Sequence, residues 1–353
     1  MPKLFDPIVI RGLEIKNRAW VSPMCQYSAV DGVVGEWHHV HLGGFATGGA
    51  GLIMAEATGV VPEGRISIGC PGLYNDEQVA AWTPIVNFVH SMGSKMGIQL
   101  AHAGRKGATA LPWSDHRMAT PEEGGWQAVA PSAIAFEGYP EPHALTVQEI
   151  QGLVKSFGLA AKRALAAGFD LVEIHAAHGY LIHEFYSPLS NHRTDEYGGD
   201  FDGRTRFLKE VVAEVRNSIL ETTPLFVRIS ASDWTEGGWT IEDSVKLSSE
   251  LKSLGVDLID VSSGGNVHNA KIAVGPGYQV PFAEAIKHGA SISTSAVGMI
   301  IDPLQANEII ESGKADAVML AREMLRNPRW PLHAAKVLGA DIKWPVQMER
   351  ARL

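Results

Sequence analysis

The sequence has few of the features that mark secreted, membrane-spanning or nucleic-acid-binding proteins. Only two cysteines, Cys25 and Cys70, occur in 353 residues, so we expect a reduced, cytoplasmic protein without a disulfide framework or a signal peptide. No apolar run approaches the roughly 20 residues that a membrane-spanning helix needs. The net charge of −9 argues against nucleic acid as a partner, because phosphate binding requires a basic face.

Eight short aliphatic runs recur along the chain. They lie at 19–24, 51–58, 96–101, 170–175, 225–230, 257–262, 290–294 and 316–320. Near-continuous apolarity without strict alternation is typical of strands buried on both faces. Amphipathic stretches separate the runs, with Thr146 and Thr240 as predicted N-caps and Gly168, Gly255 and Gly313 where helices end.

This alternation predicts an α/β fold, a single (β/α)8 TIM barrel in which residues 1–353 form one domain. An open doubly wound sheet is the alternative. No G-x-G-x-x-G follows the first run, which argues against a dinucleotide-binding Rossmann domain. Residues 4–16 predict a short N-terminal hairpin that closes the bottom of the barrel. Residues 103–145, after the third strand, predict a long loop, and a loop of this length often serves as a lid.

Polar residues follow most of the predicted strands, at the end of a barrel where active sites form. Val297 and Gly298 follow the seventh run, and Ala321 and Arg322 follow the eighth, with a short helix expected at 322–326. These two loops often bind phosphate in barrels through backbone N–H groups, to which an arginine adds charge. A plain turn glycine and a surface arginine are the alternative interpretation.

Two polar residues lie inside predicted buried strands. An unpaired Arg228 would be unfavourable there, so it either forms an internal ion pair with Glu173 or Asp260, or lies beside a cofactor that accumulates negative charge, as a reduced flavin does. A buried Gln99 must be hydrogen-bonded, and the pyrimidine edge of a flavin offers both donors and acceptors.

The segment His175-Ala-Ala-His178-Gly-Tyr180 follows the fourth predicted strand. Two histidines at this spacing could bind a metal, but Glu173 is expected on the opposite face of the strand, and we predict no metal site. They could also be ordinary core histidines. Alternatively, their N–H groups could hold a substrate oxygen and stabilise its developing charge, while Tyr180 donates a proton.

Two further groups of residues are interpreted as structural. The cluster at 38–41, His-His-Val-His, lies in a helical stretch and is expected to form helix surface and packing. Cys25 lies at a strand end, where it could touch a cofactor, whereas Cys70 lies in a loop rich in glycine and proline and is expected to be inert.

Together these motifs resemble the Old Yellow Enzyme family, and most closely its short, cysteine-containing subclass, often called thermophilic-like, which includes the xenobiotic reductases. The resemblance rests on SPMCQYS (22–28), EATGV (56–60), GIQLAHAGRK (97–106), the 35 residues at 173–207, VRIS (227–230), STSAVGMI (293–300) and AREMLRNPRWP (321–331). It covers almost the whole chain, and HAAH rather than HxxN points to this subclass.

The resemblance implies an FMN-dependent ene-reductase with NADPH or NADH as reductant. It implies that FMN is held by Ser22, Pro23, Met24, Cys25, Ala57, Gln99, Arg228, Val297, Gly298, Ala321 and Arg322. It also implies that His175 and His178 hold the substrate oxygen, that Tyr180 protonates the substrate and that Tyr27 helps to position it. Arg350 matches an arginine that reaches into a neighbouring subunit's active site, which implies a homodimer or homotetramer.

The implied reaction is a ping-pong hydride transfer from the nicotinamide to FMN and then to an activated C=C bond. Enones, maleimides and nitro compounds are the implied substrates. An FMN barrel reductase for one metabolite, such as an enoyl or dienoyl thioester, is the alternative. The sequence departs from the subclass at Ala321, where glycine is usual, and in its tail MERARL, which lacks the terminal aromatic residue of some relatives.

Overall fold

Eight parallel strands close into a barrel in the computed structural model of the protein, which describes residues 2–352. The strands are β3 (Ala19–Val21), β4 (Leu52–Gly59), β5 (Lys95–Ala101), β8 (Leu171–Ala176), β9 (Leu225–Ser230), β10 (Leu258–Ser262), β11 (Ser293–Ala296) and β12 (Ala317–Leu320). Each falls within or overlaps one of the eight predicted runs. The ring closes where Val318 of β12 pairs with Ala19 of β3, so the predicted barrel is confirmed and the open sheet is wrong.

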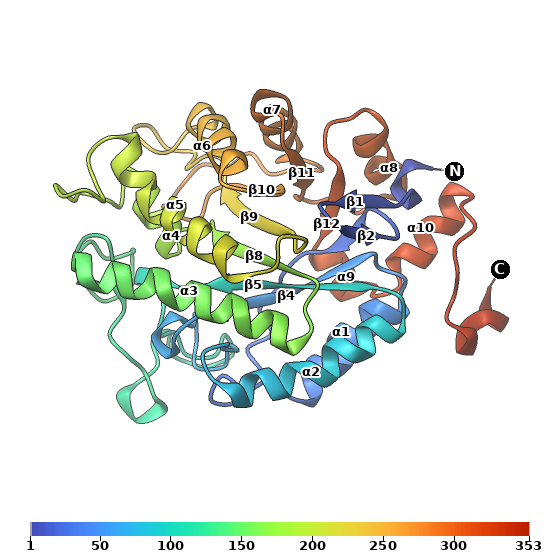
Figure 1. Ribbon diagram of the computed structural model, residues 1–353, viewed down its shortest axis with the longest axis horizontal. Coiled ribbons are helices and arrows are strands. Elements are labelled where there is room, and N and C mark those ends of the chain that lie inside the picture. Colours follow the sequence, from blue (N-terminus) through green and yellow to red (C-terminus); the bar gives the residue numbers. More distant parts are fainter. Residues whose placement is uncertain (1, 353) are drawn as a thin grey trace.

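Helices surround the barrel (Figure 1). They are α1 (Glu36–Thr47), α2 (Asp76–Ser91), α3 (Val147–Ala167), α4 (Leu181–Tyr186), α5 (Phe201–Ser218), α6 (Ile241–Ser253), α7 (Val280–Ala290), α8 (Pro303–Glu311), α9 (Arg322–Arg326) and α10 (Trp330–Leu338). Thr146 and Thr240 cap α3 and α6 through their side chains, as predicted. Gly168 ends α3 in the left-handed conformation that glycine adopts without strain.

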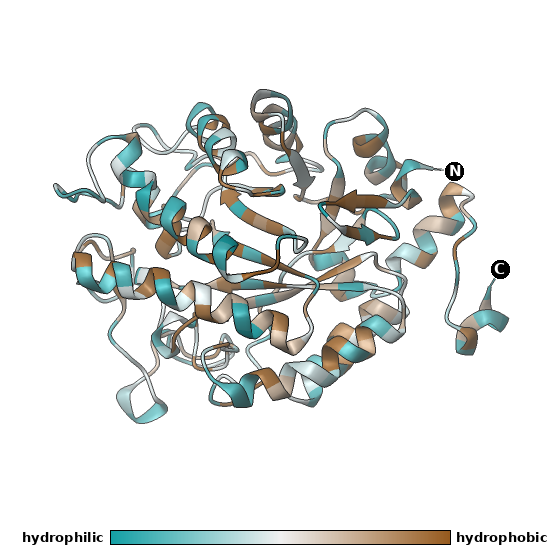
Figure 2. Cartoon of the chain, viewed as in Figure 1, coloured by the Kyte–Doolittle hydropathy of each residue, from teal (hydrophilic) through white to brown (hydrophobic). Residues whose placement is uncertain are grey.

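The bottom of the barrel is closed by the predicted hairpin of β1 (Ile8–Ile10) and β2 (Leu13–Ile15). Ile10 and Ile15 pack with buried apolar side chains that point into the barrel from its strands, among them Trp20, Met54 and Phe226. The rings of Trp20 and Phe226 stack at 6.0 Å between centroids. Figure 2 shows this hairpin as largely hydrophobic, so the bottom of the barrel is an apolar plug.

The long predicted loop after β5 extends from the opposite end of the molecule (Figure 1). Residues 103–145 contain no α-helix. They hold two short 3-10 turns, Gly104–Lys106 and Pro121–Glu123, and a two-residue parallel pairing of β6 (Val129–Ala130) with β7 (His143–Ala144). Across residues 2–352, none of the helices combines the length and apolarity needed to cross a bilayer.

Candidate functional site at the mouth of the barrel

Polar side chains fill the barrel interior above the apolar plug. The strand register places Gln99 beside Glu173, and it places His175, Arg228 and Asp260 side by side on β8, β9 and β10. Arg228 Nε lies 2.9 Å from Asp260 Oδ2, although the alignment falls short of a hydrogen bond. The ion pair considered for Arg228 is therefore present, and it leaves the guanidinium beside the histidines.

The expectation that Glu173 faces away from His175 is wrong. Residues two apart on a strand share a face, and the carboxylate of Glu173 accepts a hydrogen bond from Gln99 Nε2 at 2.8 Å inside the barrel. Burial, with the nearby Asp260 charge, raises the pKa of Glu173 to about 8. Gln99 is buried and hydrogen-bonded, as predicted, and its partner within the chain is this carboxyl group.

His175, His178 and Tyr180 converge at the end of β8. The His175 ring lies 5.2 Å from the His178 ring and 5.1 Å from the Tyr180 ring, measured between centroids. The His178 N–H donates to Ser230 Oγ at 2.9 Å, and its Nε2 lies 2.7 Å from Ser262 Oγ. The HAAHGY segment therefore forms one cluster held by the neighbouring strands.

Electrostatics keep both imidazoles neutral near physiological pH. Burial lowers the pKa of His175 and of His178 well below its usual range, and the positive charge of Arg228 lowers each further. Burial also raises the pKa of Tyr180 well above its usual range. Two neutral imidazoles and a protonated phenol can each donate a hydrogen bond to an oxygen atom.

Lys106 also belongs to this cluster, although the sequence placed it merely in a loop. Its Nζ donates to the carbonyl oxygens of His178, at 2.7 Å, and Gly265, at 3.0 Å. It lies 4.9 Å from the centroid of the Tyr180 ring, within cation–π distance. Burial lowers the pKa of Lys106 to about 8. In the sequence, the signal for this role was the motif GIQLAHAGRK (97–106), which ends on Lys106.

The segment that follows β3 lines another side of the mouth. Ser22 is buried, whereas Pro23, Met24, Cys25 and Tyr27 are half-buried. Cys25 and Tyr27 pack against a buried group that includes Ala57 of β4 and Cys70, and Tyr180 packs on the same group. Two of the predicted flavin-ring residues, Cys25 and Ala57, thus share one surface with the predicted proton donor.

The loops after β11 and β12 meet as predicted. A cavity of about 340 Å3 is lined by Arg228, Val297, Gly298, Ala321, Arg322 and their neighbours. Gly298 has φ +126°, which residues with a side chain rarely adopt. Arg322 opens α9, as predicted. These five residues come from three strand ends, so the geometry agrees with an anion site at this position.

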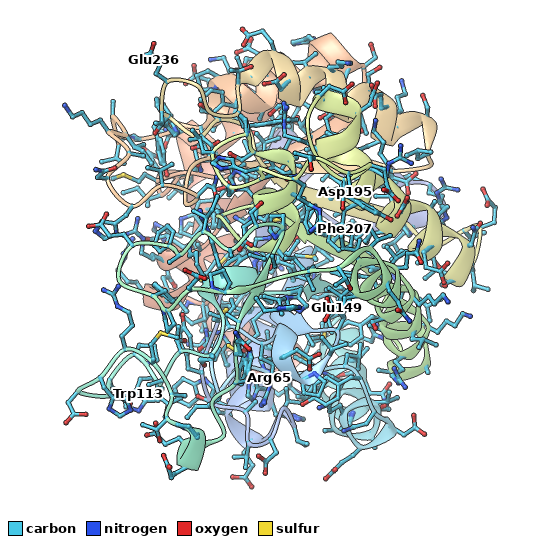
Figure 3. The ribbon with its side chains drawn as sticks, turned by 90° about the vertical axis from the view of Figure 1, so that its left-hand side faces the viewer. Arg65, Trp113, Glu149, Asp195, Phe207 and Glu236 are labelled. Carbon is cyan, nitrogen blue, oxygen red and sulfur yellow. The ribbon has the colours of Figure 1, made fainter. Side chains whose placement is uncertain are left out.

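A second cavity, of about 450 Å3, lies between the mouth and the long loop. Tyr27, Lys106, Tyr139 and Tyr180 line it, together with residues 109–112 and 114–117 of the loop. Figure 3 faces this end of the molecule, with Trp113 on the long loop at one edge. The Tyr27 and Trp113 rings contact edge to face at 6.4 Å, so the loop borders the approach to the site.

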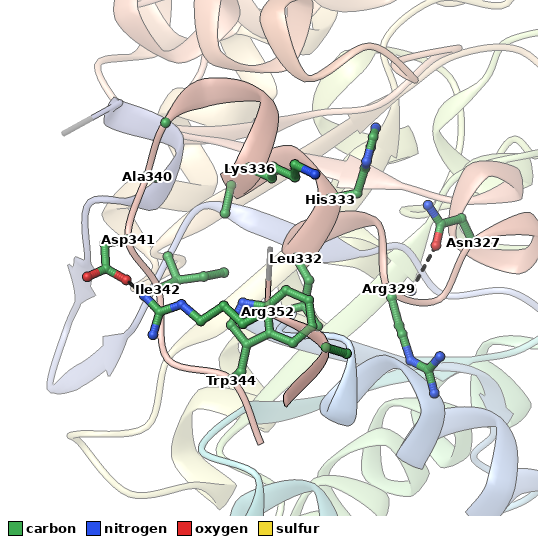
Figure 4. A pocket seen from close by; sticks show the side chains of 13 residues that line it. Asn327, Arg329, Leu332, His333, Lys336, Ala340, Asp341, Ile342, Trp344 and Arg352 are labelled. Carbon is green, nitrogen blue, oxygen red and sulfur yellow. Dashed lines mark hydrogen bonds and ion pairs between the residues drawn. The ribbon is translucent and has the colours of Figure 1, made fainter. Parts of the chain in front are cut away.

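Arg350 does not join this site within one chain. It is exposed in the 3-10 turn Val346–Ala351, on the C-terminal tail. The tail borders a hollow of about 510 Å3 beside α10, which is lined by Trp344 and Arg352 of the tail and by His333 and Lys336 of the helix (Figure 4). The structure describes one chain, and the predicted reach of Arg350 into a neighbouring subunit stays a prediction.

The barrel, the cavity beside Arg322 and the histidine cluster agree with one class of protein, the flavin-dependent oxidoreductases built on a (β/α)8 barrel. The family model described as "NADH:flavin oxidoreductase / NADH oxidase family" matches residues 3–340. The chain belongs to this family and is an oxidoreductase that uses FMN and a nicotinamide nucleotide.

Within that class, the chain is similar in sequence and in structure to several known proteins. An NADPH dehydrogenase of Geobacillus sp. (strain WCH70) is 50% identical over 350 residues, which cover 98% of each chain. One from Bacillus subtilis (strain 168) is 48% identical over 99% of this chain and 98% of its own. The old yellow enzyme homologue of Zymomonas mobilis superposes with a TM-score of 0.78 at 31% identity, covering 98% of this chain and 95% of that one. Morphinone reductase gives a TM-score of 0.80 at 30% identity, covering 98% and 91%.

The described residues fit the cofactor that this family implies. Among them, Ser22 Oγ and His175 Nδ1 are buried without a hydrogen-bond partner; Ser22 follows β3, and His175 lies near the end of β8. Buried polar atoms ordinarily have partners, and a flavin ring carries donors and acceptors along its edges. The cavity beside Arg322 offers the cation and the glycine turn that a phosphate requires.

Proposed function

We propose that the protein is an NAD(P)H-dependent ene-reductase, which reduces the C=C bond of α,β-unsaturated carbonyl and nitro compounds. The observation that carries the proposal is the convergence of His175, His178 and Tyr180 at the end of β8. FMN, when bound, supplies the hydride chemistry for both halves of a ping-pong cycle. The chain then has to bind the substrate oxygen and to deliver one proton.

The two histidines are suited to the oxygen. Their lowered pKa values make each a neutral donor that polarises a carbonyl or nitro group without giving up its proton. Donors aimed at an oxygen that gains negative charge stabilise the transition state more than the bound substrate. His178 is additionally held in place by its hydrogen bonds with Ser230 and Ser262. Its side chain therefore needs little reorganisation when negative charge develops on the substrate oxygen.

Tyr180 is suited to the proton. Its raised pKa keeps the phenol protonated until a carbanion-like carbon forms beside it. Lys106, above the ring face, favours the phenolate that remains after the transfer. We assign Tyr27 to positioning of the substrate, because it lines the outer cavity opposite Lys106.

For the cofactor, we assign the ring to Ser22, Pro23, Met24, Cys25, Ala57, Gln99 and Arg228, and the phosphate to Val297, Gly298, Ala321 and Arg322. The charge supports this division. Arg228 can compensate negative charge on a reduced ring, while Arg322 lines the cavity after β12. We also propose a homodimer or homotetramer in which Arg350 completes the neighbour's site, and NADPH as the preferred reductant, as in the names of the relatives.

The test separates flavin reduction from alkene reduction. Purified protein should be yellow, bleach anaerobically with NADPH, and recover its colour when a cyclic enone is added. The double variant His175→Ala/His178→Ala should still bleach, but should reoxidise with the enone about 10²–10³-fold more slowly, the usual effect of removing oxyanion donors. An unchanged reoxidation rate at full flavin content would overturn the histidine assignment. Reoxidation only by a thioester would favour the single-metabolite alternative.

A further inference from the structure

Cys25, Cys70 and Glu56 form a compact group beside the mouth. Their two sulfur atoms and one carboxylate oxygen all lie within 4.8 Å of one another. They come from three places in the chain: the segment after β3, the loop after β4 and β4 itself. Cys70 is fully buried and Glu56 is 4% exposed, whereas Cys25 is half-buried, so the group is open only on the side of Cys25.

Glu56 is poorly compensated where it lies. One oxygen accepts the Gln26 N–H at 2.9 Å. The other lies 3.4 Å from His38 Nε2, a contact that does not meet hydrogen-bond geometry, and within residues 2–352 this buried nitrogen has no other partner. A buried carboxylate with so few donors is unfavourable unless a cation joins it.

We propose that Cys25, Cys70 and Glu56 form a binding site for one soft divalent cation, represented by Zn²⁺ or Cd²⁺. Thiolates select such ions, and a carboxylate completes a three-ligand site whose fourth position is open to water. His38 would act from behind, by orienting Glu56, as partners of metal-bound carboxylates do. Binding requires no redox step: each thiol that becomes a ligand releases its proton to the solvent.

The dimensions suit this ion. Zinc lies about 2.3 Å from sulfur and about 2.0–2.2 Å from oxygen, so the ligand atoms of a tetrahedral site are roughly 3.4–3.8 Å apart. Any two of the three atoms therefore need to draw together by at most about 1.0–1.4 Å. Cys25 is half-buried within the irregular segment 22–29 and can supply most of that movement. The inference does not depend on the proposed ene-reductase activity.

The experiment is metal uptake by the FMN-loaded, thiol-reduced protein. Equilibrium dialysis against Zn²⁺ or Cd²⁺, with the metal measured by mass spectrometry, should give one ion per chain. Cd²⁺ should also produce a thiolate-to-cadmium charge-transfer band in the ultraviolet. Cys70→Ser and Glu56→Gln should each weaken binding more than about 100-fold, and His38→Gln about 10–100-fold, the range for a residue that orients a ligand.

His116 provides a matched control. It is an exposed histidine that lies 2.8 Å from Asp115 and 3.0 Å from Glu123, so it is the kind of surface group that binds metal adventitiously. His116→Ala should leave uptake unchanged. Equal uptake by the parent protein and Cys70→Ser, loss of uptake in His116→Ala, or no uptake at all would overturn the proposal. If Cys70→Ser folds poorly, the parent protein can be treated with a thiol reagent in urea-free buffer, with and without the metal. Bound metal should slow the modification of Cys25 and Cys70, and an unchanged rate would contradict the proposal.

Discussion

The two ends of the barrel use the same eight strands for opposite purposes. At the bottom, Trp20, Met54 and Phe226 meet the hairpin in a wholly apolar plug. At the top, the same β9 that carries Phe226 carries Arg228 two residues later. Packing at the bottom provides stability, and this allows the top to hold buried charges that contribute little net stability of their own. We therefore expect changes at the bottom of the barrel to affect mainly the free energy of unfolding, and changes at the top to affect mainly the reaction.

The strongest test of this separation is at the bottom. Trp20→Ala should lower the free energy of unfolding by about 3–5 kcal/mol, because it leaves a large cavity between the hairpin and Phe226. Flavin bleaching by NADPH should persist in the folded fraction. Urea denaturation and anaerobic absorbance measure the two quantities. Loss of flavin chemistry in fully folded Trp20→Ala protein would show that the two ends are coupled.

The corresponding change at the top is Tyr180→Phe. Removal of a general acid slows its step by about 10²–10⁴-fold, so reoxidation of the reduced protein by an enone should slow to that extent. Unfolding in urea should shift little, because the phenyl ring keeps the contact with His175. Stopped-flow absorbance resolves the two half-reactions. A variant that reoxidises at the parental rate would remove Tyr180 from its assigned role.

Lys106→Met tests whether the hydrogen bonds of Lys106 hold the His178 turn in place at the top of the barrel. The lysine makes two charged hydrogen bonds to backbone carbonyls, and such bonds are worth about 1.5–3 kcal/mol each. We expect substrate affinity to fall about 10–100-fold, since the His178 turn loosens. Lys155→Met, at an exposed position of α3, is the control. A matching change in both variants would point to a general effect of lost charge.

The pH dependence of stability tests the buried carboxyl group of Glu184. Burial raises the pKa of Glu184 from 4.5 in the unfolded chain to about 8. Between these values the folded protein keeps a proton that the unfolded chain releases, so this contribution to stability is full below pH 4.5 and is lost as pH rises toward 8. The slope reaches at most about 1.4 kcal/mol per pH unit. Glu184→Gln should flatten the change in melting temperature between pH 5 and pH 8, as measured by calorimetry, and an unchanged profile would contradict this.

The smallest effect is expected at Ala321, which replaces the usual glycine. Its backbone, at φ −107°, lies outside the region that requires glycine. Ala321→Gly should therefore change FMN affinity by no more than about 0.5 kcal/mol. Fluorescence titration of flavin-free protein measures it. A gain of tenfold or more would show that this methyl group crowds the cofactor.

The fold was largely predictable, because buried parallel strands leave continuous apolar runs and the helix caps are local signals. The convergence of His175 with His178, and of the loops after β11 and β12, was also predictable, since strand ends of a barrel meet at one face; the roles assigned to these residues stay predictions. Contacts between residues far apart in the chain were not. His38 was interpreted as packing and Cys70 as inert, yet Glu56 lies beside both. Nothing in their local sequence encodes that meeting, which depends on how the loops after β3 and β4 fold over each other.

The backbone at His178 has a consequence for which residues can occupy that position. Its φ of +60° is left-handed, a conformation that histidine and asparagine adopt more readily than most residues and β-branched residues strongly resist. The turn therefore admits a short list of side chains before any chemistry is considered, and two members of that list can donate a hydrogen bond to an oxygen. Variation at this position during evolution, or in a designed library, is thus filtered first by backbone shape and only then by activity.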